Sequence, residues 1–349
     1  MKPKNKNIID YLSRRKFLYT CGSILAGGTI LGVSGVLLHK IFMLPVNNRI
    51  APNGTILNNS KQSNENGLKS PYKLVSSFRT TDRIEGFDVF NEKVILAASN
   101  LLSIYDYSGT LLTSFAIGSN IRDIVVDKEM IYLLFPTRIE VYTMEGDLLH
   151  DWEACSDDSD YCSFAVAPES VFVTDASNKN ICKYTSEGTF VKFIQSPDGF
   201  IVPSYSFGIT YANGSIFCSN PGRHKVENYT LEGEYVASFG KPGGAAGYFS
   251  GCCNPVHLSY NTAGEIITSE KGNPRICCYS PNGEFRSVLL DSKILGGGHA
   301  AYDIKISKDK LFVAGENSIS LFQYDAHLAT ETACSACDVD CPLRKGITI

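Results

Sequence analysis

A tyrosine followed four residues later by a glycine ends five β-patterned segments of this chain. Successive tyrosines lie 37, 42, 45 and 50 residues apart. Repeats of this length, with short strands and a turn glycine in every unit, indicate the blades of a β-propeller rather than a sandwich or a βαβ fold. The five pairs are Tyr105/Gly109, Tyr142/Gly146, Tyr184/Gly188, Tyr229/Gly233 and Tyr279/Gly283.

The third unit shows the order inside each repeat. Four apolar stretches, separated by Pro, Asn or Gly, predict one four-stranded antiparallel meander. Its last turn ends at Gly188, because glycine adopts the positive φ that a tight hairpin needs without a steric penalty. The stretches are Phe164 to Ala167, Val171 to Val173, Ile181 to Tyr184 and Phe190 to Ile194.

The last unit lacks an outer strand. No fourth strand follows the segment Ile319 to Phe322, whereas Tyr72 to Phe78 precedes the first complete unit and resembles the outer strands. We expect this N-terminal strand to complete the last blade, which would close the ring and protect a bare sheet edge. Residues 71–328 number 258, or 43 per blade, and predict six blades, with seven as the competing count.

Two units resemble a known repeat family. The order of motifs between Ser238 and Phe285 resembles the NHL repeat, and a looser version spans Asp175 to Ile181. The resemblance covers about half of the ring and implies a propeller fold without implying one reaction, because such folds carry many functions. The motifs are Ser238-Phe239-Gly240-Lys241-Pro242-Gly243, Gly247-Tyr248-Phe249, Asn254-Pro255, Gly264-Glu265-Ile266, Asn273-Pro274-Arg275-Ile276 and Gly283-Glu284-Phe285.

The N-terminus resembles a twin-arginine export signal. Arg14 and Arg15 precede Lys16-Phe17-Leu18, and the uncharged run from Phe17 to Leu38 has 22 residues with five glycines. Such a run is long enough to span a bilayer as a helix. An anchor for the general secretion route is the alternative. No Ala-x-Ala cleavage site follows, so an uncleaved anchor is favoured.

Four parts are expected along the chain. Cationic residues stay on the cytoplasmic side, so the propeller is expected on the periplasmic side, held at the cytoplasmic membrane by the N-terminal helix. The segment after the anchor is rich in Asn, Ser and Gly and is typical of a flexible tether. The parts are residues 1–45 (signal or anchor), 46–70 (linker), 71–328 (propeller) and 329–349 (Cys-rich tail).

Composition narrows the function. A net charge of -4, without a basic cluster beyond the signal, argues against a nucleic-acid partner. Cysteine is abundant, with 12 in the chain and 11 beyond the signal. Because an odd number cannot all pair within one chain, at least one is free, metal-bound or intermolecular. Strand cysteines such as Cys182 are expected in the core or in disulfides, and Cys155 and Cys162 could form a local disulfide.

Two cysteine groups are candidate metal sites. Cys252 and Cys253 are neighbours in a loop flanked by glycine and Asn-Pro, where a vicinal disulfide or a thiolate ligand pair are both open. The tail carries Cys334, Cys337 and Cys341 before a proline, a spacing that partly resembles iron–sulfur ligation. Zinc is an equal alternative for the cofactor, and disulfides within the tail remain open.

One mouth of the ring is the candidate ligand site. Loops from each outer strand to the next inner strand, and loops between second and third strands, open on the same face of a propeller. The residues placed there are Cys162, Cys252, Cys253, His299, Arg223, His224, Glu270 and Lys271, with Arg275 from the NHL-like motif and His257 on an inner strand facing the channel. A hydrogen-bonded channel histidine is the alternative for His257.

Two functional classes follow. We expect a membrane-tethered, extracytoplasmic propeller that acts as a metal-binding or redox accessory for another extracytoplasmic or membrane protein. The alternative is a metal-dependent propeller hydrolase or lyase with its site at the channel mouth, so enzymatic activity is left open. The absence of a Ser-His-Asp pattern, phosphate loop or H-E-x-x-H motif from the sequence favours the first class.

Overall fold

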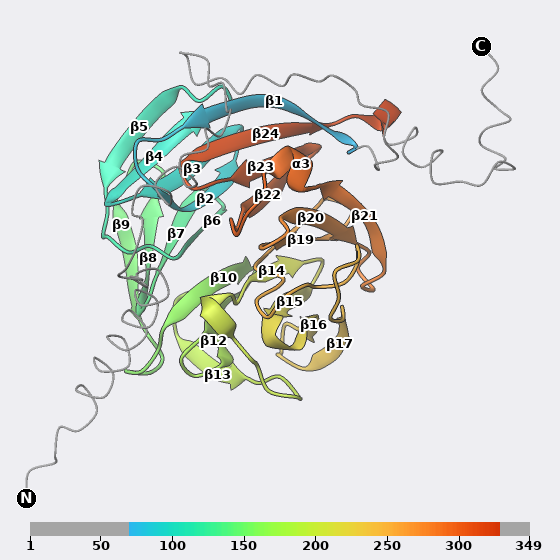
Figure 1. Ribbon diagram of the computed structural model, residues 1–349. Helices are drawn as coiled ribbons and strands as arrows, with labels where there is room; N and C mark the ends of the chain where they lie inside the picture. Colours follow the sequence, from blue (N-terminus) through green and yellow to red (C-terminus); the bar gives the residue numbers. More distant parts are fainter. Residues whose placement is uncertain (1–69, 329–349) are drawn as a thin grey trace, which may run out of the picture. The chain divides into compact units, whose positions relative to one another are not determined.

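The computed structural model describes residues 70–328, which form six four-stranded antiparallel sheets arranged as the blades of a propeller (Figure 1). The predicted export signal, linker and cysteine tail lie outside the described residues. The prediction of an all-β, six-bladed propeller is therefore confirmed. No helix between residues 70 and 328 has the length and apolar character needed to cross a membrane.

Blades 1 to 3 follow one another along the chain, each running from its innermost to its outermost strand. Blade 1 contains β2 (Ile84–Phe90), β3 (Lys93–Ala98), β4 (Leu101–Asp106) and β5 (Leu111–Ala116). Blade 2 contains β6 (Asp123–Asp127), β7 (Met130–Phe135), β8 (Arg138–Thr143) and β9 (Leu148–Glu153). Blade 3 contains β10 (Tyr161–Ala167), β11 (Ser170–Asp175), β12 (Asn180–Thr185) and β13 (Phe190–Ile194).

Blades 4 to 6 complete the ring. Blade 4 contains β14 (Ile209–Ala212), β15 (Ser215–Asn220), β16 (Lys225–Thr230) and β17 (Tyr235–Phe239). Blade 5 contains β18 (His257–Tyr260), β19 (Ile266–Glu270), β20 (Arg275–Tyr279) and β21 (Phe285–Leu290). Blade 6 contains β22 (Asp303–Ser307), β23 (Lys310–Ala314), β24 (Ser318–Tyr324) and β1 (Tyr72–Arg79). The short helices are η1 (Pro203–Tyr205), η2 (Pro221–Arg223) and α3 (Ser292–Leu295).

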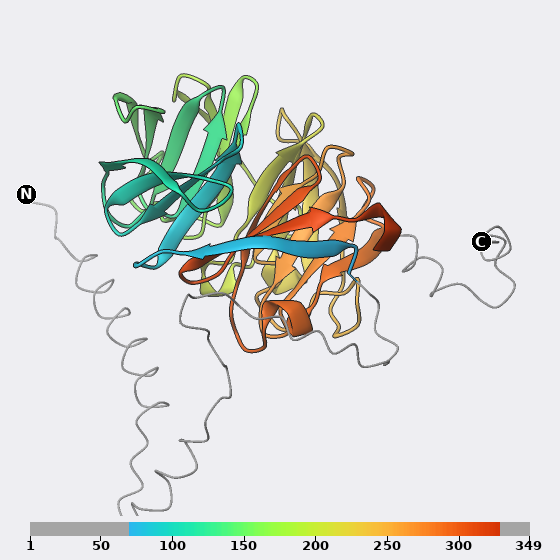
Figure 2. The same ribbon diagram turned by 90° about the horizontal axis from the view of Figure 1, so that it is seen from above.

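The ring closes through its first strand, as the sequence predicts. Strand β1 pairs antiparallel with β24, with Phe78 opposite Ile319 and Tyr72 opposite Tyr324. Figures 1 and 2 show the blue strand β1 lying along the red strand β24. The innermost strands contact one another in order around the channel, and β22 returns to β2. Closure therefore covers the edge that β24 would otherwise expose.

The repeated tyrosine and glycine pack between blades. In each of the five units, a Cβ added at the turn glycine would lie under 3.0 Å from a side chain on the outer strand of the preceding blade. Four of the five tyrosine rings also contact that side chain. The glycine pairs are Gly109/Phe78, Gly146/Phe115, Gly188/Trp152, Gly233/Ile194 and Gly283/Phe239. The repeat thus reflects the close approach of neighbouring blades, and the single tryptophan has a role in it.

Candidate functional site

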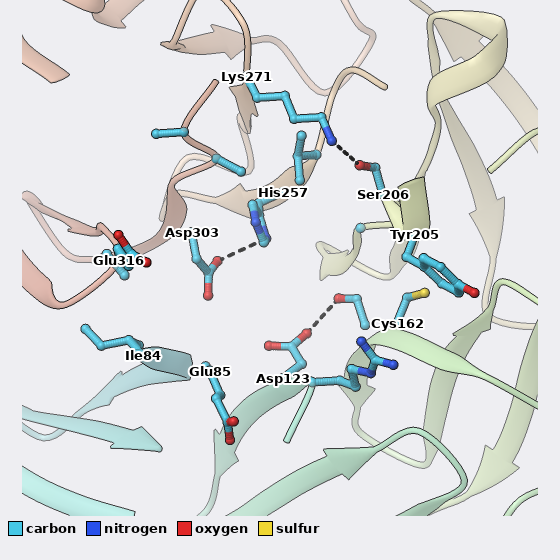
Figure 3. A pocket seen from close by; sticks show the side chains of 18 of the residues that line it. Ile84, Glu85, Asp123, Cys162, Tyr205, Ser206, His257, Lys271, Asp303 and Glu316 are labelled. Atoms are coloured by element: carbon cyan, nitrogen blue, oxygen red, sulfur yellow. Dashed lines mark hydrogen bonds and ion pairs between the residues drawn. The ribbon is translucent and has the colours of Figure 1, made fainter. Parts of the chain in front are cut away.

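A cavity of about 500 Å³ opens at the mouth of the ring where the inner strands begin. Its walls combine the first residues of inner strands with loops that enter them (Figure 3). Inner strands supply Asp123 of β6, Ser163 of β10, His257 of β18 and Asp303 of β22. The loop after β19 supplies Lys271. Strand β2 adds Glu85. Five of the six blades therefore contribute polar groups to the cavity.

His257 and Asp303 form the central pair of this cavity. They begin neighbouring inner strands, and His257 Nδ1 lies 3.5 Å from Asp303 Oδ1 (Figure 3). Their side chains remain 36% and 21% exposed, so both face the hollow rather than the core. Because the carboxylate engages Nδ1, Nε2 is the nitrogen left for a bound molecule. A histidine held in this way can serve as a general base or general acid toward a bound molecule.

The carboxylate of Asp303 is held in place by the backbone N–H of the next residue. Its Oδ1 accepts a hydrogen bond from the N–H of Ile304 at 2.7 Å. Asp123 has the same arrangement with Ile124 at 2.8 Å, and its Oδ2 also accepts from Ser163 Oγ at 2.6 Å. These contacts fix the carboxylates at the starts of β22 and β6. Burial raises the pKa of Asp123, and the Lys305 ammonium, 3.9 Å from Asp123 Oδ1, opposes that rise.

Lys271 is held by a neighbouring loop. The Asn254 side chain accepts from the backbone N–H of Lys271 at 2.9 Å and donates to its carbonyl oxygen at 2.9 Å. The ammonium group donates to Ser206 Oγ at 3.3 Å, and Figure 3 shows it reaching across the cavity from above His257. A fixed backbone with a long cationic side chain suits the recognition of a partly negative oxygen atom.

The structure brings together only some of the residues that the sequence singled out. Cys162, His257, Lys271 and His299 line the cavity. Burial raises the pKa of the Cys162 thiol to about 12, so this sulfur stays protonated near neutral pH and is a poor nucleophile. The charged lining residues that sequence reasoning missed are Arg83, Glu85, Arg122, Asp123, Asp303 and Glu316. Asp123 and Asp303 do share one sequence feature: each is followed by isoleucine at the start of an inner strand.

Glu270 and Arg275 do not line the cavity. They lie opposite each other in the register of β19 and β20. Arg275 donates from Nε to Glu270 Oε1 at 2.6 Å and from Nη2 to Oε2 at 2.9 Å. Arg275 also donates to the carbonyl oxygen of Gly244 at 3.0 Å. This bidentate buried pair secures the loop after β17 and leaves neither charge for a ligand.

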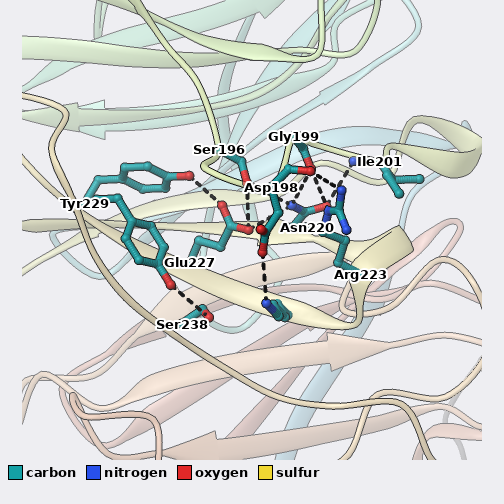
Figure 4. A network of polar contacts seen from close by, with 11 residues as sticks. Ser196, Asp198, Gly199, Ile201, Asn220, Arg223, Glu227, Tyr229 and Ser238 are labelled. Atoms are coloured by element: carbon teal, nitrogen blue, oxygen red, sulfur yellow. Dashed lines mark hydrogen bonds and ion pairs between the residues drawn. The ribbon is translucent and has the colours of Figure 1, made fainter.

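Arg223 and His224 also have structural partners. Arg223 Nε donates to the carbonyl oxygen of Gly199 at 2.8 Å (Figure 4). His224 Nδ1 lies 3.1 Å from the carbonyl oxygen of Phe249. Beside them, Asn220 Nδ2 donates to the buried Glu227 carboxylate at 2.8 Å. The Tyr229 hydroxyl donates to the other oxygen of Glu227 at 2.5 Å. This network holds blade 4 together outside the mouth cavity.

The vicinal cysteines lie beside the cavity but do not line it. Cys252 and Cys253 have their sulfurs 3.2 Å apart in an exposed loop, and Cys253 contacts Ser204 Oγ at 3.6 Å. Between residues 70 and 328, one group of three possible metal ligands lies within 4.8 Å, namely Cys155, Asp175 and Cys182. The vicinal pair therefore has no third ligand from this part of the chain. Cys334, Cys337 and Cys341 lie outside it.

The chain resembles solved propeller structures in fold. A catalytically inactive virginiamycin B lyase from Staphylococcus aureus, solved with quinupristin, matches at 16% identity over 72% of this chain and 99% of its own, with a TM-score of 0.51. A streptogramin B lyase matches at 14% identity over 73% and 98%, with a TM-score of 0.54. A Bacteroides thetaiotaomicron protein of unknown function matches at 12% identity over 72% and 75%, with a TM-score of 0.53.

These similarities support the six-bladed propeller fold. Two of the similar structures are lyases. No protein-family model matches this chain, and no curated protein does. The NHL resemblance of blades 4 and 5 therefore stays a prediction.

Proposed function

We propose that this protein is an extracytoplasmic propeller whose mouth cavity binds a small polar molecule and catalyses an elimination of the lyase type. The observation that carries the proposal is the His257–Asp303 pair inside a cavity of about 500 Å³. Cavities of this size suit small molecules, and a few convergent polar groups orient them. The names of two structural neighbours as lyases support the reaction class.

The residues divide the chemistry among them. His257 Nε2 removes a proton next to a carbonyl group of the substrate, while Asp303 orients the ring and stabilises the imidazolium that forms. The Lys271 ammonium stabilises the negative charge that develops on the carbonyl oxygen. The electron pair left on carbon then forms a double bond and expels the leaving group, and the proton held on His257 passes to that group. No water molecule is consumed, which distinguishes this reaction from hydrolysis.

A nucleophilic mechanism has less support at this mouth. The Cys162 thiol is protonated, and the Ser163 hydroxyl already donates to Asp123 at 2.6 Å rather than to a histidine. In the usual arrangement of a serine nucleophile, a histidine accepts the proton of the hydroxyl group. Among residues 70–328, the mouth carboxylates and histidines do not form a cluster of three ligand atoms within 4.8 Å. The proposal therefore assigns the chemistry to protein side chains.

The export and anchoring expectations belong to the same proposal. The Arg14/Arg15 signal would carry the propeller across the membrane, and the run from Phe17 to Leu38 would keep it attached. A partner, if recruited there, would be another extracytoplasmic or membrane protein.

A metal-binding or redox accessory role is the second candidate. It is favoured by the 3.2 Å separation of the exposed Cys252 and Cys253 sulfurs. Elemental analysis and an optical spectrum of protein purified anaerobically would separate bound zinc, an iron–sulfur cluster and all-disulfide protein. Loss of the metal in a Cys252→Ser variant would support this role, whereas absence of metal from the unsubstituted protein would remove it.

Ring opening of quinupristin, a cyclic peptide closed by an ester, tests the preferred proposal. We expect turnover by the unsubstituted protein and a rate lower by about 10² or more in His257→Gln, the usual loss when a general base is removed. His150→Gln, on the exposed side of β9, is the matched control and should keep full activity. Absence of turnover of quinupristin and of simple esters of β-hydroxy amino acids would contradict the proposal.

A further inference from the structure

A second reactive site lies between blades 2 and 3, away from the mouth. Cys155 follows the outer strand β9, and Cys182 lies within β12 of the next blade. Their sulfurs are 2.8 Å apart, although 27 residues separate them in the sequence. Cys155 is partly exposed and Cys182 is fully buried. An accessible sulfur in contact with a second sulfur is suited to thiol–disulfide exchange, whose rate depends on access and on thiolate character.

Tyrosine hydroxyls surround the accessible sulfur. The Tyr161 hydroxyl donates to Cys155 Sγ at 3.4 Å and accepts from the Cys155 backbone N–H at 2.9 Å. It also bonds to the Tyr184 hydroxyl. Contact with Cys182 and with Tyr161 lowers the pKa of Cys155 to about 6, while the same sulfur contact and burial raise the pKa of Cys182. Cys155 is therefore the sulfur that loses its proton more readily.

A metal fits this pair poorly. Two thiolates on a tetrahedral zinc ion, each about 2.3 Å from the metal, lie about 3.8 Å apart, which is well beyond the 2.8 Å observed here. The nearby Asp175 carboxylate already accepts from the backbone N–H groups of Asp160, Ser177 and Asn178 and from the Asn178 side chain. Asp175 therefore stabilises the loop after β11. The geometry favours a bond between the sulfurs.

Packing alone does not account for Cys182 at this place. It lies two residues before the repeat tyrosine Tyr184, where blades 2 and 4 carry Glu140 and Glu227. In those blades the glutamate accepts a hydrogen bond from its tyrosine, at 2.7 and 2.5 Å. Blade 3 has a cysteine, Cys182, at this repeat position, and Cys155 from the loop after β9 lies against it. Blade 5 also has a cysteine at this repeat position, Cys277, and it provides a matched control.

We propose that Cys155 and Cys182 form a redox-active dithiol that is oxidised by disulfide exchange with a cationic disulfide. The charge preference comes from the exposed Asp157 and Asp158, which follow Cys155 in the same loop. Opposite charges raise the rate of encounter between a loop and its reagent. The inference is independent of the chemistry proposed for the mouth.

The exchange runs in two balanced steps. The Cys155 thiolate attacks one sulfur of the disulfide, whose S–S bond breaks, and the first thiol leaves while a mixed disulfide forms on Cys155. Cys182 then attacks the Cys155 sulfur, its proton passes to the departing second thiol, and the Cys155–Cys182 bond forms. Two electrons move from the protein to the reagent, which is reduced to two thiols. Hydrogen bonds to the Cys155 thiolate stabilise the reduced protein, so its disulfide should be readily reducible.

Cystamine is the probe for the test. Reduced full-length protein is treated with cystamine at pH 7, quenched with acid, alkylated and mapped by mass spectrometry. We expect a Cys155–Cys182 link that millimolar glutathione reopens, and slower oxidation by the anionic glutathione disulfide than by cystamine at low salt. Cys182→Ser should trap cysteamine on Cys155, Cys155→Ser should prevent the link, and Cys277→Ser should leave it unchanged.

Three results would overturn the inference. The first is that both sulfurs remain alkylatable after cystamine treatment. The second is that Cys155 pairs with another cysteine such as Cys162. The third is a link that glutathione does not reopen, which would make it a structural disulfide. If Cys182→Ser does not fold, alkylation of Cys155 in the unsubstituted protein still decides the outcome, because its rate should rise around pH 6 and exceed that of Cys162 at least tenfold.

Discussion

Gly188 of blade 3 lies directly against Trp152 of blade 2, so closely that a Cβ at Gly188 would stand 2.3 Å from the indole Nε1. The Tyr184 ring stacks on the same indole, with ring centroids 6.5 Å apart. Four other turn glycines meet the preceding blade in the same way. The repeated tyrosine and glycine are therefore explained by the contact between neighbouring blades.

We predict that Gly188→Ala destabilises the propeller by about 2–4 kcal/mol, because the new methyl group meets Trp152 and the residue keeps a positive φ. Gly199→Ala separates the two causes. Gly199 also has a positive φ, of 74°, but nothing lies within 4 Å of an added Cβ. It should lose only about 1 kcal/mol. Urea denaturation measures both, and an equal loss in the two variants would show that the Trp152 contact contributes nothing.

Lys305 neutralises a group of carboxylates inside the channel. Its ammonium lies 3.9 Å from Asp123 Oδ1 and donates to the carbonyl oxygen of Ile124 at 3.3 Å. Burial opposes the charge on Lys305, but the carboxylates of Asp88 and Asp123 outweigh it and raise its pKa. Burial also raises the pKa of both carboxyl groups. The charges therefore depend on one another.

We predict that Lys305→Met destabilises the protein by about 3–5 kcal/mol at pH 7, since it leaves the partly buried carboxylates of Asp88 and Asp123 without a cation. The loss should be smaller at pH 5, because the raised pKa values of Asp88 and Asp123 let them take up protons. Denaturation at pH 5 and pH 7 measures this difference. Lys308→Met, an exposed lysine at the next turn, is the control and should change little.

The unsubstituted protein should also lose stability in alkali. Because the folded pKa of Lys305 exceeds its unfolded value of about 10.4, the stabilisation is complete below that pH and is lost as pH rises through the folded pKa. This decline should be weaker in Lys305→Met. A decline of the same size in both proteins would show that Lys305 does not cause it.

Export should depend on Arg14 and Arg15 as a pair. Changing both to lysine keeps the charge but removes the planar guanidinium groups that a twin-arginine receptor would recognise. We predict that the double variant stays inside the cytoplasm, as measured by cell fractionation. Lys4→Gln, which lowers the charge and leaves the arginines intact, should be exported normally. Normal export of the double variant would identify a general secretion anchor instead.

The fold was predictable because its determinants repeat. The unpaired segment after Phe322 and the similar strand before the first blade together predicted closure, and β1 pairs with β24 as expected. Lys271 could be placed at the mouth because loop position decides the face, and His257 because it lies on an inner strand that lines the channel. Side-chain contacts between neighbouring blades could not be predicted from the repeat. Cys162 alternates to the blade 4 side of β10, so Cys155 meets Cys182 instead.

Glu270 and Arg275 show why residue type and loop position do not suffice for a site. Both flank a loop on the mouth side, which suggested ligand-binding charges. Strand register places them opposite each other, and a buried guanidinium next to a carboxylate forms a bidentate pair. The Asp303 that pairs with His257 carries only a weak sequence signal, the Asp-Ile pair that opens its inner strand. It becomes recognisable once β18 and β22 are known to be neighbours.

The central claim, an elimination at the mouth, is tested most directly by the mass of the product that the unsubstituted protein forms from quinupristin. Elimination opens the ring without adding atoms, so the account predicts a linear product of the same mass as the substrate. That product should be missing from His257→Gln. A product heavier by one water molecule would show hydrolysis and would contradict the account, as would an intact ring together with no turnover of the simple esters.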